Sequence, residues 1–212
     1  MAEGKIKNWF VRFTAYNTAH VVHQQEQVNS CGIACILMIN LKMKKGLMAA
    51  GMAATAAVSV VPIIGGFLGV DLGTKVLDYA VKTEPQVYKI YGDVVGTVYD
   101  GTSYTNASNH PAVLEKLGCG QWEAFWAGGA GVSAAIKDAV AAGAPCIVHV
   151  TWKAGGAHFV VVDEVVNIGG LDWAMVNDPA DGDIHVTLLS PGSAPSYDAG
   201  AGNFSGWIVR RK

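Results

Sequence analysis

Apolar residues gather into closely spaced runs along the chain, and their pattern changes after about two thirds of its length. Before that point, CGIACILMINLKM over residues 31–43 is apolar on nearly every side, which predicts a buried central helix. Residues 71–82 predict a second, amphipathic helix. Residues 111–117 and 133–142 also predict helices, and Gly143 is expected to end the latter.

From residue 145 onward the pattern is typical of strands. Short runs rich in β-branched residues are separated by Gly, Asp and Pro, which predicts an antiparallel sheet. The predicted strands cover residues 146–152, 158–166, 173–177, 184–189 and 207–209. Residues 9–16 predict a further strand or extended arm, and the polar segment 83–109 predicts loops with short strands. Helices first and strands later indicate an α+β fold.

Residues 46–70 carry no charged side chain, and this length could span a bilayer. The segment is rich in Ala and Gly, contains Thr55 and Pro62, and lacks the density of Leu, Ile and Phe that favours insertion. We therefore expect a buried helix over residues 47–60 followed by a Pro-Gly bend. Contact with a membrane through a hairpin in this segment is the alternative.

Composition narrows the classes of function. The chain has 212 residues, a formal charge of −2, 51% hydrophobic residues and 15% charged residues. Such a chain can build a sizeable core, and it lacks the basic excess that binds nucleic acid by charge. We expect one domain over residues 1–212, with an N-terminal arm over 1–24. The arm does not have the pattern of a signal peptide, which predicts a soluble protein, cytoplasmic or exported by a signal-independent route.

The four cysteines do not form the pattern of a disulfide scaffold or a metal site. Cys31 and Cys35 are four residues apart, so a helix would place them on one face. Cys119 and Cys146 lack the spacing of zinc ligands. We expect reduced thiols, or at most one disulfide, and no metal or cofactor.

Cys31 stands where the polar segment 27–30 meets the apolar run. A thiol at the start of a helix lies near unpaired backbone N–H groups, which favour the thiolate form. Gly32 follows and has no side chain, so we expect a substrate backbone to approach closely there. Cys31 is therefore a candidate nucleophile.

Three further residues complement this thiol. His158 enters a predicted strand after a Gly-Gly bend, and Asp178 ends the next strand, so a carboxylate can orient an imidazole that faces the thiol. Gln25 lies six residues before Cys31 and is placed to stabilise an oxyanion together with the Cys31 backbone N–H. Gln25, Cys31, His158 and Asp178 form the candidate catalytic set.

The segments that carry these residues resemble a known family. QEQVNSCGIACILMI resembles the Gln-x5-Cys-Gly-x-Ala signature of papain-like cysteine peptidases. More narrowly, it is similar to the bacteriocin-processing peptidases that cut after double-glycine leaders. AAGAPCIVHVTWKAGGAHFVVVDEV and AMVNDPADGD resemble that family's Gly-x-Pro strand, Gly-x-His-Phe strand and Asp-Pro-x-x-Gly turn. The resemblance covers residues 25–40 and 133–183.

The resemblance implies a papain-like fold with a helical N-terminal half and a C-terminal antiparallel sheet. The central helix would carry the nucleophile Cys31, and the sheet would carry the base His158 and the orienting residue Asp178. Gln25 would be the oxyanion donor. Asn177 is a rival for the role of Asp178, and strand alternation allows only one of them to serve.

The chain also departs from that family. Ser30 stands where the family usually has Asp, and the divergent segment 46–131 does not align with it. Gln24 and Gln27 are rival oxyanion donors, although only Gln25 has the family's spacing. The processing members are fused to membrane transporters, whereas this chain has neither an ATP-binding motif nor a bundle of spanning helices.

These features predict a cysteine endopeptidase that cuts protein or peptide substrates, with a preference for Gly-Gly. They also predict an effector or toxin that acts inside a target cell and has a cognate immunity or inhibitor protein. The alternatives are a papain-like amidase, including a cell-wall peptide amidase, and an acyltransferase or transglutaminase. A binding module without activity is disfavoured because all four chemical positions are filled.

Overall fold

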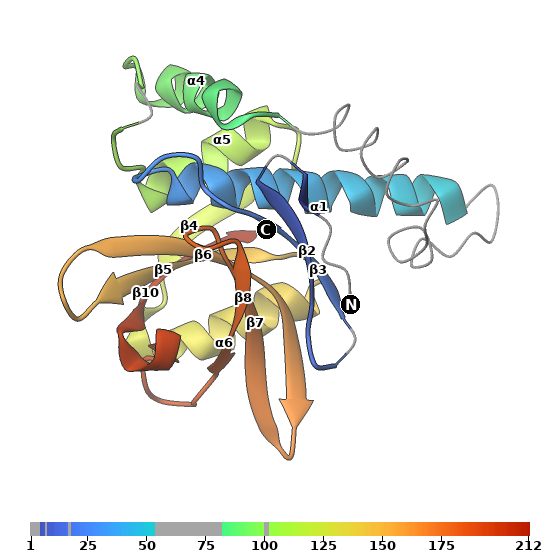
Figure 1. Cartoon of the computed structure of the whole chain (residues 1–212), viewed down its shortest axis with the longest axis vertical. Coiled ribbons are helices and arrows are strands. Elements are labelled where there is room, and N and C mark those ends of the chain that lie inside the picture. Colours follow the sequence, from blue (N-terminus) through green and yellow to red (C-terminus); the bar gives the residue numbers. More distant parts are fainter. Residues whose placement is uncertain (1–4, 7, 17, 54–81, 100–101) are drawn as a thin grey trace.

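The computed structural model describes residues 5–6, 8–16, 18–53, 82–99 and 102–212 (Figure 1). The helices of this part are α1 (Cys31–Ala53), α4 (Glu84–Val95), α5 (His110–Lys116) and α6 (Gly128–Ala141), with 3-10 turns η1 (Ala107–Asn109) and η2 (Asp198–Gly200). The strands form two antiparallel sheets. The fold is therefore mixed α+β, as the sequence predicts.

The large sheet has seven strands and contains most of the C-terminal half of the chain. Its strand order is β4-β10-β5-β6-β7-β8, and β9 pairs with β10. The bounds are β4 (Trp122–Trp126), β5 (Cys146–Trp152), β6 (Ala157–Ile168), β7 (Leu171–Asp178), β8 (Asp183–Leu188), β9 (Ser196–Tyr197) and β10 (Gly202–Arg211). The small sheet contains β1 (Lys5–Ile6), β2 (Trp9–Phe13) and β3 (Ala19–His23) in that order.

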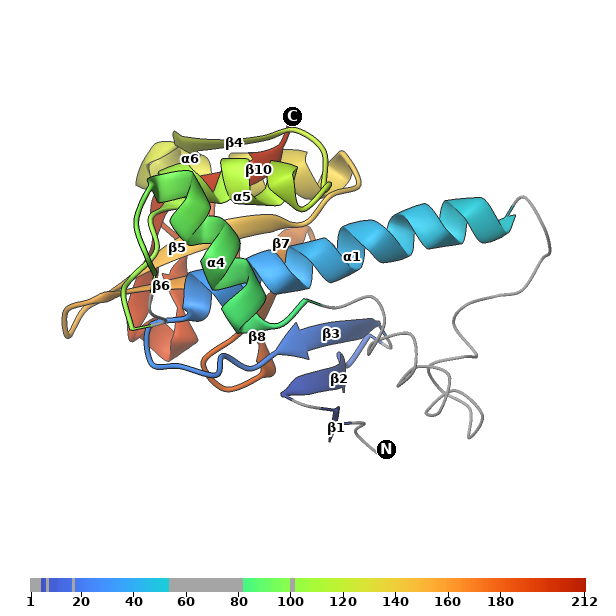
Figure 2. The ribbon, with the colours of Figure 1, turned by 90° about the horizontal axis from the view of Figure 1, so that it is seen from above.

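Helices cover both faces of the large sheet. Figures 1 and 2 show α1, α4 and α5 on one side of β5 and β6, and α6 on the other. Successive residues of a strand enter different cores: Ile147 packs in the cluster around α1, and Val148 packs in the cluster around α6. Because both faces are covered, these central strands are almost continuously apolar, which explains why they are easily found in the sequence.

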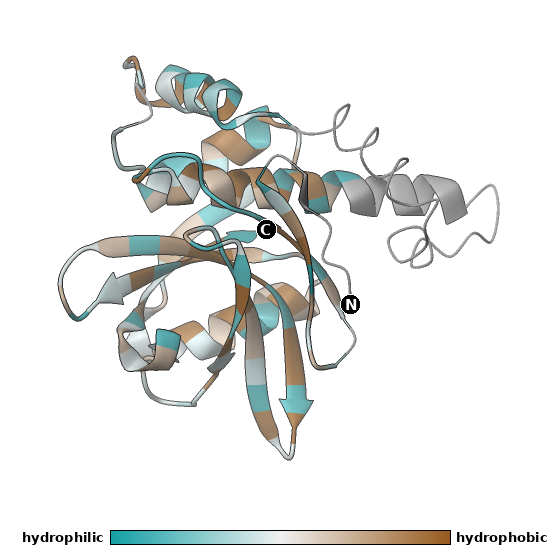
Figure 3. Ribbon diagram, in the orientation of Figure 1, coloured by the Kyte–Doolittle hydropathy of each residue, from teal (hydrophilic) through white to brown (hydrophobic). Residues whose placement is uncertain are grey.

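The predicted central helix is confirmed and is longer than expected. It begins at Cys31 and continues to Ala53, without the separation expected before residue 47. Figure 3 shows mostly apolar residues along the coloured part of α1, residues 31–44. The rest of the predicted helix 47–60, the Pro-Gly bend and residues 71–81 of the second predicted helix lie outside the described residues. Among the described residues, no helix is both long enough and apolar enough to cross a membrane.

The prediction of loops over residues 83–109 is wrong, because α4 occupies much of this segment. The side chain of Gln86 accepts a hydrogen bond from the backbone N–H of Thr83 (3.0 Å), which closes the first turn. Gly96, with φ of 76°, ends the helix by donating to the carbonyl of Gly92 (2.8 Å). Buried tyrosines, which are poor helix formers, conceal the helical pattern in the sequence.

The other differences concern shorter elements. The predicted strands of the C-terminal third are present, whereas β1, β3, β4 and β9 are not predicted from the sequence. Helix α6 begins at Gly128, five residues before the predicted start at 133. Gly143 ends the following turn with φ of 79°, as predicted. The missed elements are short, and tertiary packing rather than local pattern stabilises them.

Candidate active site

Cys31 is the first residue of α1 and is buried, with 7% of its surface exposed. The preceding turn has its own hydrogen bonds. Ser30 donates from its backbone N–H (3.2 Å) and from its Oγ (3.0 Å) to the carbonyl of Gln27. The carbonyl of Ser30 accepts from the N–H of Ala34 (2.9 Å), the first bond of the helix. These bonds place the thiol at the positive end of the helix dipole.

His158 is the second residue of β6 and is also buried. Gly155 and Gly156, with φ of 94° and 93°, form the bend that leads into the strand, as the sequence predicts. The His158 Nε2 lies 2.6 Å from the Asp178 Oδ1. The indole of Trp152 stacks on the imidazole, with ring centroids 5.8 Å apart. The ring is therefore held by a carboxylate at its edge and by an aromatic residue on its face.

Asp178 is the last residue of β7 and receives three hydrogen bonds. Besides His158, the backbone N–H of Ala180 donates to its Oδ1 (2.7 Å), and the hydroxyl of Tyr197 donates to its Oδ2 (2.5 Å). Burial favours the neutral acid, but the bonds to His158, Tyr197 and Ala180 outweigh it and lower the pKa of Asp178. Asp178 is therefore a buried carboxylate that remains charged.

Strand alternation separates Asn177 from this network, as expected. Asn177 and Asp178 are neighbours in β7, so their side chains lie on opposite faces of the sheet. The side chain of Asp178 bonds to His158, and the backbone of Asn177 pairs with that of Val161. The side-chain amide of Asn177 is fully buried and has no hydrogen-bond partner among the described residues. The structure thus brings Asp178, and not Asn177, to the histidine.

Cys31 and His158 come together across the interface between α1 and β6. Burial by itself would lower the pKa of His158, but hydrogen bonds to Asp178 and to Cys31 raise it to about 9. The imidazole therefore keeps its proton at neutral pH. The Cys31 sulfur at the N-terminus of α1 therefore lies beside a cationic imidazole. Three of the four predicted residues thus form one connected group.

Gln25 lies close to this group, but its side chain makes other bonds. Its Nε2 donates to the carbonyls of Gln27 (2.7 Å) and Val28 (2.9 Å) in its own loop. Its backbone N–H donates to the carbonyl of Pro179 (2.7 Å), directly after Asp178. Its Oε1 is buried and has no partner among the described residues. The Gln25 amide could donate to an oxyanion only after its side chain turns away from the two loop carbonyls.

The space next to Gly32 is filled, contrary to the expectation that a substrate backbone approaches there. A Cβ on Gly32 would lie 2.0 Å from the Thr105 Oγ1 and 2.9 Å from the His110 Nε2. Thr105 and His110 are themselves hydrogen-bonded at 2.9 Å. Glycine is needed because the segment before α5 packs against the first turn of α1.

Two residues of the site are not predicted from the sequence. Tyr197 is fully buried and bonds to Asp178, yet it stands in a Gly- and Pro-rich stretch that has no strand pattern. Trp152 stacks on His158. The single signal for Tyr197 is an isolated aromatic residue among small ones, which does not indicate a partner.

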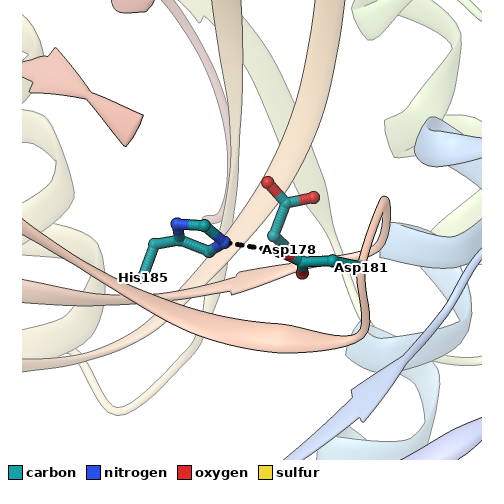
Figure 4. A group of neighbouring side chains, drawn as sticks. All are labelled: Asp178, Asp181 and His185. Carbon is teal, nitrogen blue, oxygen red and sulfur yellow. Dashed lines mark hydrogen bonds and ion pairs between the residues drawn. The ribbon is translucent and has the colours of Figure 1, made fainter. Parts of the chain in front are cut away.

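Asp181 and His185 lie beside Asp178 and raise the question of a metal site. Single ligand atoms of the three residues lie within 4.8 Å of one another. Figure 4 shows that the His185 Nε2 is joined to the Asp181 Oδ2 (2.8 Å), while Asp178 is joined to neither. Both oxygens of Asp178 already accept hydrogen bonds from protein donors. A cation would have to compete with these bonds, so the three residues do not form an available ligand set.

No family model and no curated protein sequence matches the chain.

Proposed function

We propose that this protein is a cysteine peptidase in which Cys31 is the nucleophile, His158 the general acid and base, and Asp178 the residue that orients His158. The observation that carries the proposal is the 2.6 Å hydrogen bond between His158 and Asp178, together with Cys31 lying close enough to His158 to help raise its pKa. Thiol, imidazole and carboxylate in this order form the minimal apparatus of nucleophilic acyl transfer.

The proposed reaction has two stages. The Cys31 thiolate attacks the carbonyl carbon of the scissile amide, and the C–N bond breaks as the amine leaves with the proton of His158. This stage produces a thioester. Neutral His158 then takes a proton from water as the water oxygen attacks the thioester, and the C–S bond breaks. The carboxylic product leaves, and the thiolate and imidazolium are restored.

The oxyanion of both stages would lie at the start of α1. The first N–H groups of a helix have no intrahelical acceptor, so the Cys31 backbone N–H is a candidate donor. The Gln25 amide becomes a second donor in this proposal if it exchanges its bonds to the loop carbonyls for the oxyanion. The charged product of attack would favour that exchange, because hydrogen bonds to charged acceptors are the stronger ones.

A papain-like fold is part of the proposal. The start of a long helix meets an antiparallel sheet that contributes the histidine and the carboxylate, which agrees with the arrangement that the resemblance implies. The order Gln25, Cys31, His158 and Asp178 along the chain also agrees with it.

The direct test compares new protein N-termini produced in a proteome by the wild type and by Cys31→Ala. The wild type should generate a consistent set of cuts, and Cys31→Ala should lose them by about a thousandfold or more. Cys35→Ala is the matched control, because Cys35 lies one turn further along the same helix and is fully buried in the core. Cuts that persist in Cys31→Ala would refute the proposal.

An intracellular effector role with a cognate inhibitor is the second part of the proposal. Expression of the wild type in the cytosol of a sensitive cell should arrest growth, and Cys31→Ala should not. Equal toxicity of both would reject a role through peptide-bond cleavage. Hydrolysis of an amide bond in the cell wall with release of a free amine, or formation of an isopeptide bond, would instead identify the amidase or acyltransferase that the same residues could support.

A further inference from the structure

Residues 179–182 form the turn that joins β7 to β8, directly after Asp178 (Figure 4). Two N–H groups of this turn bond to Asp178. That of Ala180 donates to the Asp178 Oδ1 (2.7 Å), and that of Gly182 donates to the Asp178 carbonyl (3.0 Å). The Oδ1 that accepts from Ala180 is the same oxygen that bonds to His158. The position of the turn therefore sets the position of the carboxylate against the imidazole.

The turn is bound in its place by residues from the other end of the chain. Figure 2 shows the small sheet, with β2 and β3, beside β8. The backbone N–H of Gln25, just after β3, donates to the carbonyl of Pro179 (2.7 Å). The Arg12 Nε, on β2, donates to the carbonyl of Gly182 (2.9 Å). Both ends of the turn are thus bonded to the N-terminal segment.

Arg12 is fixed by an aromatic ring and a carboxylate as well as by this carbonyl. Its guanidinium lies over the ring of Phe10, 4.5 Å from the centroid, and its Nε is 3.5 Å from the Asp183 Oδ1. The Asp183 side chain is 59% exposed, so water screens the ion pair and it is worth little. The bond to the Gly182 carbonyl is charge-assisted, and we take it as the contact through which Arg12 acts.

Gly182 allows the turn and the small sheet to approach closely. Its φ of 73° lies in the left-handed region that favours glycine. A Cβ on Gly182 would lie 2.8 Å from the Phe10 Cε2, so the ring of Phe10 packs directly on the backbone of the turn. Because no side chain separates the two, a shift of β2 would be passed on to residues 179–182.

We propose that Arg12 is a positioning residue: by binding the Gly182 carbonyl it holds the turn 179–182, and through the turn it holds the Asp178 carboxylate against His158. The inference rests on the proposed function and extends it to the N-terminal sheet. Arg12 acts through the turn and not on the substrate. A displacement of about 1 Å in a catalytic group can cost roughly a hundredfold in rate, so a loosened turn should slow the reaction.

The test compares Arg12→Met with Arg12→Gln. Methionine removes the charge and the N–H donors but keeps an unbranched side chain. Glutamine also loses the charge, yet its side-chain nitrogen stands the same number of bonds from the backbone as the Arg12 Nε. In Arg12→Met, kcat should fall about tenfold to a hundredfold with little change in KM. Arg12→Gln should restore most of this loss, whereas equal losses in both variants would overturn the inference.

The titration of His158 by NMR is the readout that a merely structural role would not move. Burial lowers the pKa of His158, and its bonds to Asp178 and Cys31 raise it. The Arg12 variants leave these three residues in place, so a lower pKa reports a displaced carboxylate. We expect the pKa of His158 to be lower in Arg12→Met than in the wild type and to recover in Arg12→Gln. An unchanged pKa in Arg12→Met would overturn the inference.

Arg210→Met is the matched control. The guanidinium of Arg210 also lies 4.5 Å from a ring centroid, that of Phe125, and its Nε donates to a carboxylate, that of Glu123 (2.8 Å). These contacts join β10 to β4 instead of reaching the turn. Arg210→Met should lower the urea midpoint and leave the titration of His158 unchanged. A fall of the His158 pKa equal to that in Arg12→Met would mean that Arg12 acts only through general stability.

Two further variants keep the inference testable if Arg12→Met does not fold. Asp183→Asn removes the charge partner of Arg12 and should change neither kcat nor the titration of His158. Phe10→Leu shortens the ring that packs on Gly182 and should lower the pKa of His158, by less than Arg12→Met. A wild-type titration in Phe10→Leu, or a fall in Asp183→Asn as large as in Phe10→Leu, would overturn the inference.

The titration needs no substrate, and it therefore separates this inference from the proposed function. A lower pKa of His158 in Arg12→Met, with no Cys31-dependent cut by the wild type, would overturn the peptidase function while the positioning role stands. Cys31-dependent cuts that Arg12→Met makes at the rate of the wild type, with an unchanged titration, would overturn the positioning role and leave the peptidase function.

Discussion

Three histidines near Cys31, His110 and His158 buried and His149 partly buried, differ in charge state. On one side, His158 is bonded to the carboxylate of Asp178. On the other side, His110 and His149 are bonded to the hydroxyls of Thr105 and Ser205. Burial lowers the pKa of His110 to about 3, and it also lowers the pKa of His149, whereas the pKa of His158 rises to about 9.

The comparison shows that the partner determines the charge of a buried ring. Burial disfavours the imidazolium at all three positions, and a neutral hydroxyl does not offset that cost. An ionised carboxylate does, and the thiol at the start of α1 adds to its effect. The ring of Phe159 contacts both of the neutral imidazoles, with its centroid 4.8 Å from that of His110 and 5.0 Å from that of His149.

The largest expected effect follows from Asp178→Asn, which should make His158 resemble the two neutral histidines. Loss of the carboxylate removes the main group that holds the proton, so the pKa of His158 should fall. We expect a drop in kcat/KM on the order of 10³–10⁴ and much slower alkylation of Cys31 by iodoacetamide at pH 6. NMR titration of His158 measures the pKa directly.

The same substitution should change the pH dependence of stability. The folded-state pKa of His158, about 9, lies above its ordinary value of 6.5. Its stabilising contribution is therefore complete below pH 6.5 and is lost as the pH rises to about 9. Urea unfolding of the wild type should show this loss, and Asp178→Asn should not. Asp181→Asn is the control, and an equal change in that variant would contradict the assignment.

A smaller effect is expected from Tyr197→Phe, since Tyr197 acts on His158 only through Asp178. Removing a hydroxyl donor from the carboxylate should raise the pKa of Asp178 and move the acid limb of the kcat profile to higher pH. A hydrogen bond to a charged group is worth about 1.5–3 kcal/mol, so kcat should fall about tenfold or more with little change in KM.

Tyr91→Phe is the control for this positioning role. Tyr91 is equally buried, and its hydroxyl accepts from the backbone N–H of Asn106 (2.7 Å) instead of contacting Asp178. The acid limb of the kcat profile of Tyr91→Phe should remain at the pH of the wild type. A shift of the same size in Tyr91→Phe would mean that Tyr197 acts only through general stability.

The smallest effect concerns the neutral side of the comparison. Gly32→Ala should destabilise the fold by about 1–3 kcal/mol, because the added methyl group meets Thr105 and His110. The urea midpoint measures this loss. Combining Gly32→Ala with Thr105→Ala should relieve part of it, since Thr105 makes the closer contact. Additive losses in the double variant would contradict this packing.

The sequence alone determined the elements that combine length with strong pattern. The start of the apolar run at Cys31 predicted the start of α1, and the β-branched runs after residue 145 predicted the strands of the large sheet. Both are local signals, because a covered strand or helix must be apolar along its length. Helix α4 escaped prediction because its buried residues, Glu84, Val87, Tyr88, Tyr91 and Gly92, do not form an apolar helical stripe, and burial and capping rather than intrinsic propensity stabilise the helix.

The local sequence setting of Cys31, His158 and Asp178 also predicts that they act as one group. Only the tertiary structure decided the environment of each group: the hydroxyl of Tyr197 on Asp178, the ring of Trp152 on His158, and the present bonding of Gln25 to its own loop. A cavity lined by Cys31, residues 104–107 and parts of β5, β6 and β10 is likewise decided only by the tertiary structure. Its walls come from segments far apart in the chain, and no local pattern records which side chains long-range packing will bring together.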